Sequence, residues 1–566
     1  MLSDDACYAA VLARDPRFDG VFFVCVSTTG IYCRPICPAR TPGRTRVSFR
    51  ETPAQCEAAG YRACFRCRPE LAPGNADVDA VDALVASVTR KVSEGALNEA
   101  SVDDLAAELG VTARHLRRVT EARLGVSPIE LALSRRLGLA KQLLQDTALP
   151  ITEIAFAAGF RSVRRFNAAF IERMKASPTE IRRKHAPNTT GASLRLDYRA
   201  PYDWNALLGF LRARAVPGVE VVGENDYRRV VHIAGVTGMI RVSAPASATP
   251  SRTPDPDGAS RDGARARGRS ALSLEVSAEL VPHLMPIVAR VRRQFDLDAR
   301  PDVIARVLGK DPILASLVRA RPGLRLPGAF DPFEAAIRAM LGQQVSVAGA
   351  TTLAGRFADA FGVRFDGRDE LGRLTTRFPS AEDVAKQPVE RVAKIGMPGA
   401  RAAAILELAR AVVDRRVQLD DARDLDAFVA NLVALPGIGP WTAHYLAMRA
   451  LHVPDAFPAS DLGVKKALRG TPRECEERAA AWRPYRSYAV MHLWTSLGDS
   501  ANDDDDDDRT ATDEDDREPG RRASPVRTRR RADGRVRRNA DTAGGARGEG
   551  ADPGSRRRAA RRVLRG

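Results

Sequence analysis

Four cysteines near the start of the chain have the spacing of a metal site. Cys33 and Cys37 form a C-x₃-C pair, and Cys64 and Cys67 form a C-x₂-C pair further along. Two close pairs separated by a short stretch of chain are typical of a four-thiolate zinc site. A thiolate bound to zinc stays deprotonated at neutral pH and so remains a nucleophile. The pattern therefore indicates one Zn²⁺ on four cysteines, either as a structural clip, the commoner role, or as a reactive thiolate.

Arginine-rich sequence surrounds these cysteines, in "GIYCRPICPARTPGRTRVSF" and "GYRACFRCRPE". Residues 5–72 resemble the N-terminal domain of the bacterial adaptive-response (Ada) family. The resemblance implies that Cys33 irreversibly accepts a methyl group from a methylated DNA phosphate, with Cys37, Cys64 and Cys67 as the other zinc ligands. Four thiolates on Zn²⁺ carry a formal charge near −2, which repels DNA, so methylation of one thiolate is expected to raise the affinity for DNA.

A second candidate for chemistry, Asp461, lies far downstream. In "LVALPGIGPWTAHYLAMRAL" an apolar helix ends at Pro436, the segment Gly437-Ile438-Gly439 forms a hairpin, and a new helix starts near Pro440. Glycines let such a hairpin approach a DNA phosphate, which its N–H groups and the helix N-terminus attract. Asp461 precedes a basic helix in "FPASDLGVKKAL". Taken singly, the hairpin could be a tight helix–helix turn, and Asp461 is better explained as an N-cap.

Four motifs in order extend this picture: "FDPFEAAIRAMLGQQVSVAGATTLAGRF", "PGIGPWTAHYLAMRAL", "FPASDLGVKKAL" and "WRPYRSYAVMHLW". They resemble the helix-hairpin-helix DNA glycosylase superfamily, and within it the AlkA-type 3-methyladenine DNA glycosylase II family, over residues 193–498. The resemblance implies that Asp461 is the catalytic carboxylate, placed near C1′ to stabilise a sugar cation during hydrolytic release of alkylated purines such as 3-methyladenine and 7-methylguanine.

The same resemblance suggests a base pocket and DNA contacts. Trp441 and Tyr445, one turn apart, offer π-faces to an electron-poor base taken out of the stack, although core packing explains Tyr445 equally well. Lyase-type members have a lysine where Trp441 stands, so a monofunctional enzyme that leaves an abasic site is implied. Some relatives place an apolar wedge after the Gly-Gln of "LGQQVS", where this chain has Gln344. Gln344 and the hairpin residues are the candidate DNA contacts here.

Between the two sites the chain contains an internal repeat with a period near fifty. "SVDDLAAELGVTARHLRRVTEARLGVSPIEL" is echoed by "PITEIAFAAGFRSVRRFNAAFIERMKASPTEI". Each copy predicts a short apolar helix, a glycine turn (Gly110, Gly159), a hydroxyl N-cap (Thr112, Ser162) and an arginine-bearing second helix. The buried stripe is predicted to contain Leu116, Val119, Phe166 and Phe170.

The opposite face of the two second helices is basic. Its arginines are Arg114, Arg117, Arg118, Arg161, Arg164 and Arg165. Ordinary helical hairpins with solvated arginines would explain one copy, but a tandem pair with matching turns is less expected by chance. The pair resembles the AraC-type DNA-binding domain, which implies that both second helices enter successive major grooves of double-stranded DNA.

Composition supports a nucleic-acid partner. The 566-residue chain has a formal net charge of +17. Residues 503–518 hold eleven acids and two arginines and residues 521–566 hold sixteen arginines and four acids, a sum of only +3, so +14 belongs to the rest of the chain. A basic balance distributed over the body of the protein points to nucleic acid or an anionic surface.

The sequence predicts a cytoplasmic, nucleoid-associated protein without a membrane partner. The opening "MLSDDACYAA" is acidic and lacks the apolar core of a signal peptide, and no stretch approaches the ~20 apolar residues of a membrane span. The four cysteines outside the metal set fit a reducing compartment and core packing. They are Cys7, Cys25, Cys56 and Cys475.

The predicted architecture is multidomain and mainly α-helical. It comprises a small α+β Cys₄ zinc domain (1–75), an all-α tandem helix-turn-helix domain (83–185), a small antiparallel α+β domain (193–317) with a disordered insertion (244–270), an all-α helix-hairpin-helix glycosylase domain (318–498) and a disordered acidic, then arginine-rich tail (499–566). The insertion and the tail are assigned from their lack of periodicity and their composition.

The sequence therefore predicts a DNA alkylation repair enzyme fused to its own regulator. A zinc sensor accepts methyl groups from phosphotriesters and activates transcription, with RNA polymerase as a further partner, and a glycosylase excises alkylated purines from alkylated DNA. A monomer is expected. The alternative is a DNA-binding regulator whose glycosylase-like region reads damage without catalysis. A purely structural zinc site remains a second alternative.

Overall fold

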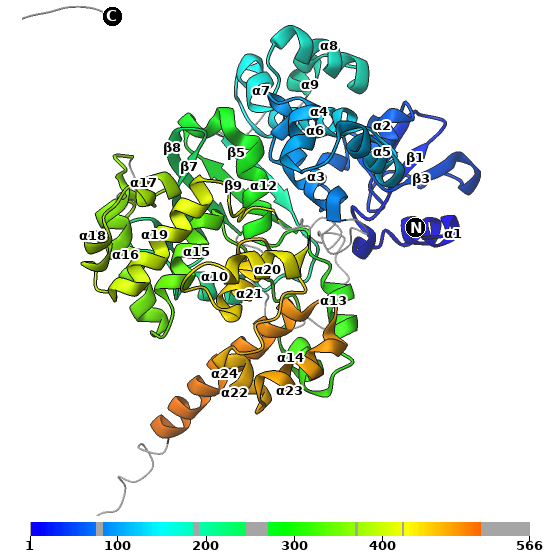
Figure 1. The fold of residues 1–566 in the computed structure, drawn as a ribbon. Coiled ribbons are helices and arrows are strands. Elements are labelled where there is room, and N and C mark those ends of the chain that lie inside the picture. Colours follow the sequence, from blue (N-terminus) through cyan, green and yellow to red (C-terminus); the bar gives the residue numbers. More distant parts are fainter. Residues whose placement is uncertain are drawn as a thin grey trace, which may run out of the picture. The chain divides into compact units, whose positions relative to one another are not determined.

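The computed structural model describes residues 2–74, 83–184, 192–244, 270–367, 372–421 and 424–510. Residues 245–269 of the predicted insertion and 511–566 of the predicted tail lie outside this description. The residues before Asp505 belong to one compact unit. As predicted, the molecule is multidomain and mainly helical (Figure 1).

The N-terminal region combines a small sheet with short helices. Strands β3, β1, β2 and β4 lie side by side in that order, with β1 antiparallel to β2 and β3 and with β2 parallel to β4. The elements are α1 (Asp4–Ala13), η1 (Pro16–Phe18), β1 (Phe23–Val26), β2 (Ile31–Cys33), η2 (Arg44–Arg46), β3 (Val47–Arg50), α2 (Pro53–Ala58), β4 (Arg62–Ala63) and η3 (Pro69–Leu71).

The second region is entirely helical. Its elements are α3 (Ala83–Ser93), η5 (Ala96–Asn98), α4 (Val102–Glu108), α5 (Ala113–Leu124), α6 (Pro128–Asp146), α7 (Ile151–Ala157), α8 (Val163–Met174) and α9 (Pro178–Lys184). Helices α4 and α5 form one helix-turn-helix and α7 and α8 the other, and the 19-residue α6 joins them. Both predicted glycine turns have positive φ, +62° at Gly110 and +84° at Gly159, a conformation that favours glycine.

The third region is the predicted antiparallel sheet. Its five strands lie in the order β5-β9-β8-β7-β6, and every neighbouring pair is antiparallel. The elements are β5 (Ala192–Asp197), α10 (Trp204–Arg212), β6 (Glu220–Val222), β7 (Asp226–Ile233), β8 (Val236–Ser243), β9 (Ala271–Val276), η7 (Ala278–His283) and α12 (Leu284–Gln294). Alternating burial along β8 explains the strand-like pattern of the sequence.

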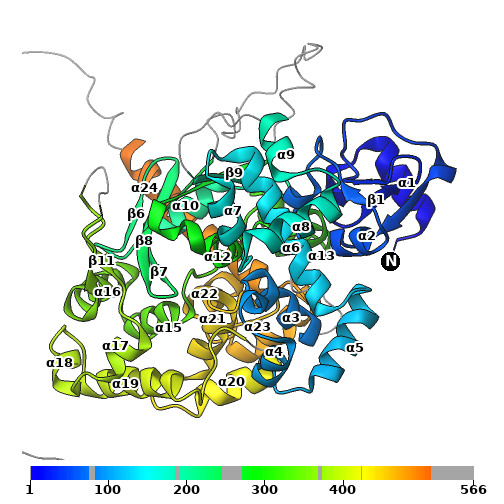
Figure 2. The same ribbon diagram turned by 90° about the horizontal axis from the view of Figure 1, so that it is seen from above.

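The described residues after α12 are mainly helical, and they include a two-stranded pair that the sequence did not reveal, β10 (Val363–Arg364) with β11 (Thr376–Arg377). The helices are α13 (Pro301–Leu308), α14 (Pro312–Ala320), α15 (Pro332–Leu341), α16 (Val347–Phe361), α17 (Ala381–Ala385), α18 (Val389–Ala393), α19 (Gly399–Val413), α20 (Leu425–Val433), α21 (Pro440–Arg449), α22 (Leu462–Leu468), α23 (Pro472–Ala479), η8 (Ala480–Trp482) and α24 (Arg486–Thr510). Figure 2 shows α19, α20 and α21 from a second direction.

One predicted helix end is wrong. Helix α20 ends at Val433 rather than at Pro436, since a turn precedes the proline. Helix α24 spans Arg486–Thr510 and so extends into the stretch assigned to the predicted tail, 499–566.

Apolar burial does not stop at the borders of these regions. One buried cluster combines Phe23 and Tyr32 of the first region with Phe166 of α8 and with Leu194 of β5. A larger cluster fills the helical region around α15, α19 and α21. All four cysteines outside the metal set are buried, as predicted, and the sulfurs of Cys25 and Cys56 lie 3.2 Å apart. Among the described residues no helix is long and apolar enough to cross a membrane.

Candidate functional sites

The two cysteine pairs converge because β2 and β4 are parallel neighbours. Tyr32 of β2 pairs with Ala63 of β4, and the Cys64 N–H donates to the Tyr32 carbonyl at 3.0 Å. Cys33 ends β2 and Cys64 directly follows β4, so this register places the two residues side by side. Within each pair, a short turn brings the second cysteine back toward the first.

The four sulfurs of Cys33, Cys37, Cys64 and Cys67 all lie within 4.8 Å of one another. Zinc–sulfur bonds of about 2.3 Å in a tetrahedron require sulfurs about 3.8 Å apart, so the cluster fits one Zn²⁺. The donor set is all thiolate, which zinc prefers over harder cations. The chain is therefore positioned to bind one zinc ion, as the sequence predicted.

The four cysteine residues differ in exposure. Cys64 and Cys67 are buried, whereas Cys33 and Cys37 are half-buried. The backbone N–H of Arg66 donates to the Cys64 sulfur and that of Arg34 to the Cys67 sulfur, both at 3.4 Å. Cys37 also receives a backbone hydrogen bond, from Ala39. Exposure alone therefore makes Cys33 and Cys37 the more accessible candidates for a nucleophile.

Asp461 lies at the start of α22, and it is an N-cap, as its position in the sequence suggested. The Val464 N–H donates to its Oδ1 at 3.0 Å. The side chain also has two further donors. The Trp441 Nε1–H donates to Oδ2 at 2.9 Å and the Trp494 Nε1–H donates to Oδ1 at 2.8 Å. Three donors from three elements therefore fix one carboxylate, which is 8% exposed.

Aromatic rings border this carboxylate. Trp441 and Tyr445 stack with centroids 5.4 Å apart and planes 22° apart, and Trp494 lies 6.4 Å from Tyr445. Tyr445 also packs against the main core cluster, so the packing role that the sequence left open is real. Trp494 is a further candidate site residue that was not predicted from the sequence. The signal that could have found it is its position as the last aromatic residue of the family motif "WRPYRSYAVMHLW".

The hairpin between α20 and α21 has an anchor and two open glycines. Ile438 is 4% exposed, whereas Gly437 and Gly439 are exposed. Gly437 has a φ of +76°, and a Cβ on it would lie 2.6 Å from the Cβ of Ala404, so only glycine fits. The Gln343 side chain donates to the Gly437 carbonyl at 2.9 Å, which ties the "LGQQ" loop to the hairpin.

Gln344 projects from the adjoining loop. It is exposed, has a φ of +58° and is followed by exposed Val345 and Val347. The structure thus leaves Gln344, a predicted DNA contact, accessible and in a left-handed conformation that is uncommon for residues with a side chain.

The predicted arginine face of the helix-turn-helix units is exposed throughout, at Arg114, Arg117, Arg118, Arg161, Arg164 and Arg165. Leu116, Phe166 and Phe170 are fully buried as predicted, but Val119 is only half-buried, and the neighbouring Thr120 is buried in its place. The Thr120 hydroxyl can lie inside because it donates to the Leu116 carbonyl at 2.7 Å. Thr112 caps α5 through its side chain, whereas Ser162 occupies the N-cap of α8 without a side-chain hydrogen bond.

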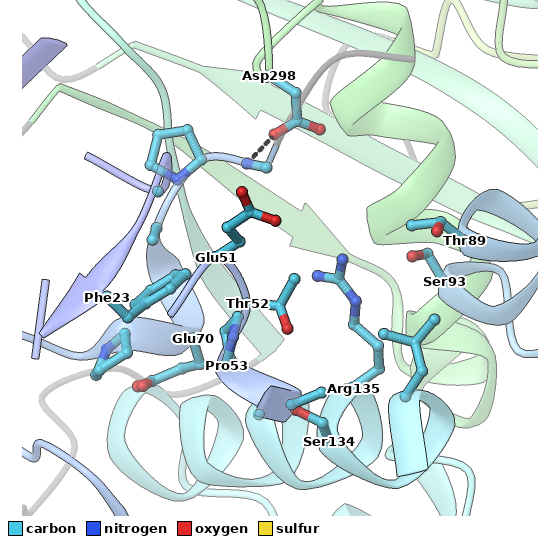
Figure 3. A pocket seen from close by; sticks show the side chains of 18 of the residues that line it. Phe23, Glu51, Thr52, Pro53, Glu70, Thr89, Ser93, Ser134, Arg135 and Asp298 are labelled. Atoms are coloured by element: carbon cyan, nitrogen blue, oxygen red, sulfur yellow. Dashed lines mark hydrogen bonds between the residues drawn. The ribbon is translucent and has the colours of Figure 1, made fainter. Parts of the chain in front are cut away.

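A cavity of about 990 Å³ lies elsewhere, lined by the first region, α3, α6 and α12 (Figure 3). The Arg135 side chain extends into it from α6, beside Thr52 and Ser134. Neither the four metal cysteines nor Asp461 lines this cavity. Burial lowers the pKa of the Arg135 guanidinium, yet that group remains a cation at neutral pH.

The comparisons with known families agree with this division. Residues 6–70 match the metal-binding domain of Ada, residues 105–184 a helix-turn-helix domain, residues 193–331 the AlkA N-terminal domain, and residues 337–473 the HhH-GPD superfamily of base excision DNA repair proteins. Three of the four matched segments contain a candidate site: the four cysteines, the two arginine-bearing helices, and Asp461 with its hairpin.

Whole-chain similarity is high to the probable bifunctional transcriptional activator/DNA repair enzyme AlkA of Mycobacterium tuberculosis, 40% identical over 510 residues, 88% of this chain and 97% of that protein. DNA-3-methyladenine glycosylase 2 of Escherichia coli is 36% identical over 304 residues, 54% of this chain and 97% of that protein. The bifunctional transcriptional activator/DNA repair enzyme Ada of Escherichia coli is 39% identical over 127 residues, 22% of this chain and 34% of that protein. The chain belongs to the family of bifunctional AlkA-type transcriptional activators and DNA repair enzymes.

Proposed function

We propose that this chain excises alkylated purines from double-stranded DNA by hydrolysis, with Asp461 as the catalytic carboxylate. The observation that carries the proposal is the fixed orientation of Asp461, whose two oxygens accept hydrogen bonds from Trp441 and Trp494 beside a stacked aromatic pair. Loss of the base leaves positive charge on the sugar, and a preoriented anion near C1′ stabilises that charge.

The surrounding residues have separate roles in this proposal. The exposed Gly437 and Gly439 and the N-terminus of α21 receive a DNA phosphate, Gln344 occupies the space that the flipped nucleotide vacates, and the faces of Trp441 and Tyr445 take the cationic base. An alkylated purine already carries positive charge, so it departs without strong acid assistance. Because position 441 is an indole rather than an amine, no Schiff base forms there, and the product is an intact strand with an abasic site.

The zinc region supplies the second activity. We propose that the Cys33 sulfur takes the methyl group of a methylphosphotriester: the oxygen–carbon bond breaks, a sulfur–carbon bond forms, and the DNA phosphate leaves as an ordinary phosphodiester anion. Zinc keeps the thiolates deprotonated at neutral pH. Cys33 is one of the two more accessible sulfurs, and the resemblance to the Ada family selects it over Cys37.

The helix-turn-helix pair provides the regulatory output. The exposed arginines of α5 and α8 suit contact with DNA phosphates and with base edges in the major groove. We propose that methylation of Cys33 strengthens promoter binding by removing a negative charge, and that the bound monomer, acting in the nucleoid, recruits RNA polymerase.

The excision proposal is tested by Asp461→Asn in the full chain. Asparagine retains the N-cap of α22, so the variant removes the charge while preserving the helix. We expect a loss of excision of about 10³-fold or more on methylated duplex DNA, measured as alkali-labile abasic sites, with binding to an abasic-site analogue retained. Normal excision by the variant would remove Asp461 from the mechanism. Absence of excision by the unaltered chain would instead favour a region that reads damage without catalysis.

A further inference from the structure

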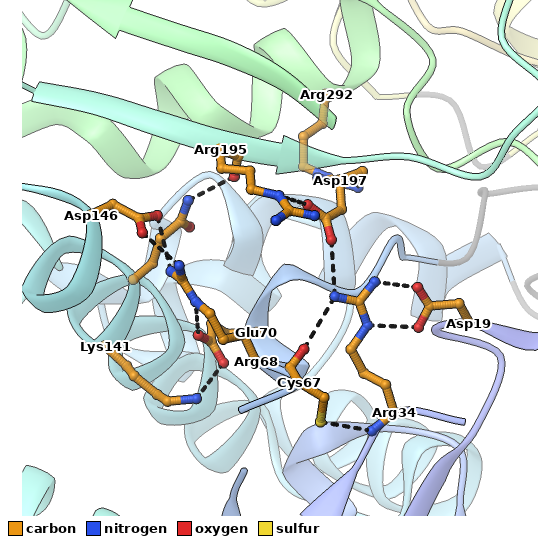
Figure 4. A network of polar contacts seen from close by, with 11 residues as sticks. Asp19, Arg34, Cys67, Arg68, Glu70, Lys141, Asp146, Arg195, Asp197 and Arg292 are labelled. Carbon is orange, nitrogen blue, oxygen red and sulfur yellow. Dashed lines mark hydrogen bonds and ion pairs between the residues drawn. The ribbon is translucent and has the colours of Figure 1, made fainter. Parts of the chain in front are cut away.

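Arg34 directly follows Cys33, the proposed methyl acceptor. Its side chain is buried against residues 192–498, here called the glycosylase half of the chain (Figure 4). Its guanidinium has carboxylate partners from both halves. Nε and Nη2 both donate to Asp19 of the zinc region, and Nη1 donates to Asp197 of β5 at 2.9 Å. Arg34 is 5% exposed and Asp197 is 3% exposed, so the contact is shielded from water.

Arg34 also joins the two ligand loops of the zinc site. It follows Cys33 directly, its backbone N–H donates to the Cys67 sulfur at 3.4 Å, and its Nη1 donates to the Cys67 carbonyl at 3.3 Å. The side chain therefore clips the first cysteine pair to the second. Its orientation in turn depends on the two carboxylates that hold the guanidinium.

Asp197 is itself firmly held within the glycosylase half. Its Oδ1 accepts from the Arg195 Nε–H at 2.6 Å, which leaves Oδ2 for Arg34. The Arg292 side chain on α12 donates to the Asp197 carbonyl at 3.3 Å. Its carboxylate is thus held by a residue of its own strand and its backbone by a helix, which makes Asp197 a rigid support for the loop that it reaches.

A second contact holds the same part of the zinc region. The Arg199 Nε–H, just past β5, donates to the Asp19 carbonyl at 3.0 Å, and its Nη2 donates to the Gly74 carbonyl at 2.8 Å. The Gly74 N–H donates to Asp298 at 2.6 Å. Asp19, the other partner of Arg34, is thus also fixed from the glycosylase half.

We propose that Asp197 is a positioning residue for the zinc site, acting through Arg34, so that the metal centre of the sensor is completed by the glycosylase half of the same chain. Partners beyond the ligands orient metal-binding side chains, and their loss typically lowers metal affinity 10- to 100-fold. Removal of Asp197 leaves a buried guanidinium nitrogen with the Cys67 carbonyl as its remaining acceptor, which loosens the clip between the ligand loops.

The experiment measures zinc release from the full-length holoprotein to a chromogenic chelator, in the unaltered chain and in Asp197→Asn. We expect release from the variant to be about tenfold faster or more. The matched control is Asp226→Asn. Asp226 is also buried at 7% exposure in the same sheet, and it pairs with Arg228 and Arg241, both within the glycosylase half. Release from this control should stay within about twofold of the unaltered chain.

Excision activity of Asp197→Asn serves as the folding check, since Asp197 lies outside the proposed catalytic site. The proposal is overturned if Asp197→Asn releases zinc at the rate of the unaltered chain. It is also overturned if Asp226→Asn accelerates zinc release as much as Asp197→Asn does. If Asp197→Asn does not fold, Arg34→Lys replaces it. Lysine keeps the charge but cannot reach two carboxylates in the forked geometry of arginine, so accelerated release is again expected, and unchanged release again overturns the proposal.

A reciprocal measurement gives a second readout. If zinc binding and the Arg34–Asp197 contact are coupled, zinc removal must loosen the contact as much as its loss weakens zinc binding. Amide hydrogen exchange in β5 should therefore accelerate when zinc is stripped from the unaltered chain and should change little in Asp197→Asn. Equal responses in the two proteins count against the coupling. Neither readout requires methyl transfer or excision, so failure here is distinct from failure of the proposed functions.

Discussion

The two proposed reactive sites differ in how exposed the reactive side chain is and in what holds it in place. Cys33 ends a strand in a small sheet, is half-buried, and depends on a metal to remain a nucleophile. Asp461 caps a helix in a large helical core, is nearly buried, and is fixed by N–H donors of three residues. A sulfur that is consumed once needs access to a bulky DNA phosphate. A carboxylate that acts repeatedly needs a constant orientation toward a flipped nucleotide, which burial among rings provides.

The largest expected effect is loss of methyl uptake in Cys33→Ser, which is compared with Cys37→Ser. A serine hydroxyl is not a nucleophile at neutral pH, so Cys33→Ser should abolish methyl uptake from methylphosphotriester DNA. Mass spectrometry of the peptide containing Cys33 measures the methyl increment, and excision should remain unchanged. Both variants lose one zinc ligand, so Cys37→Ser controls for the metal site.

Methylation of Cys33 in Cys37→Ser, together with none in Cys33→Ser, supports the assignment. If the methyl group instead appears on Cys37 in the unaltered protein, the acceptor is the other accessible sulfur. A zinc site that takes up no methyl group in any of the three proteins is structural.

The next largest loss of excision is expected when Trp494, the second indole that donates to Asp461, is replaced. Trp494→Phe keeps an aromatic ring but removes the N–H that donates to Asp461 at 2.8 Å. Hydrogen bonds to charged groups contribute about 1.5–3 kcal/mol, so single-turnover excision should fall about 10- to 100-fold. The fall should appear in the excision rate rather than in the affinity for DNA.

Trp482→Phe is the matched control, because Trp482 donates to Asp311 at 3.0 Å in the same helical region. It should lower the melting temperature while leaving the excision rate of the folded protein unchanged. Equal rates for Trp494→Phe and the unaltered chain would show that the second indole does not orient the carboxylate.

Local features account for what the sequence predicted well. The four-cysteine site, the glycine turns and the hairpin each depend on short sequence motifs, and each is found as predicted. The predicted buried stripe of α5 is wrong at Val119, because Thr120 is buried instead by bonding to its own helix, which hydropathy periodicity does not register.

Contacts between distant residues could not be predicted in this way. Arg34 and Asp197 are 163 positions apart, and nothing local to either indicates the other. Trp494 and Asp461 are 33 positions apart, and only the folded arrangement of α22 and α24 shows that the indole reaches the carboxylate. The family resemblances thus pointed to the candidate reactive atoms, whereas the partners that support those atoms depend on tertiary packing.

The smallest expected effect concerns the loop that faces DNA rather than either reactive atom. Gln344 is exposed at a φ of +58°, so its side chain has no packing role to lose, and substitution should leave stability nearly unchanged. If it fills the space of the flipped nucleotide, Gln344→Ala should weaken binding to an abasic-site duplex by a few-fold, whereas Gln344→Leu should strengthen it, since about 1 kcal/mol of apolar burial corresponds to about fivefold.

Val345→Ala, at the neighbouring exposed position, is the control for general trimming of this loop. Fluorescence anisotropy with the abasic-site duplex and with an undamaged duplex separates wedge filling from ordinary contact. Substitution of a wedge residue changes only the affinity for the abasic-site duplex, because the intact base stack of the undamaged duplex has no space to fill. If Gln344→Ala and Val345→Ala weaken binding to both duplexes equally, Gln344 is an ordinary surface contact. The flipped nucleotide must then be stabilised by Trp441 and Tyr445 alone.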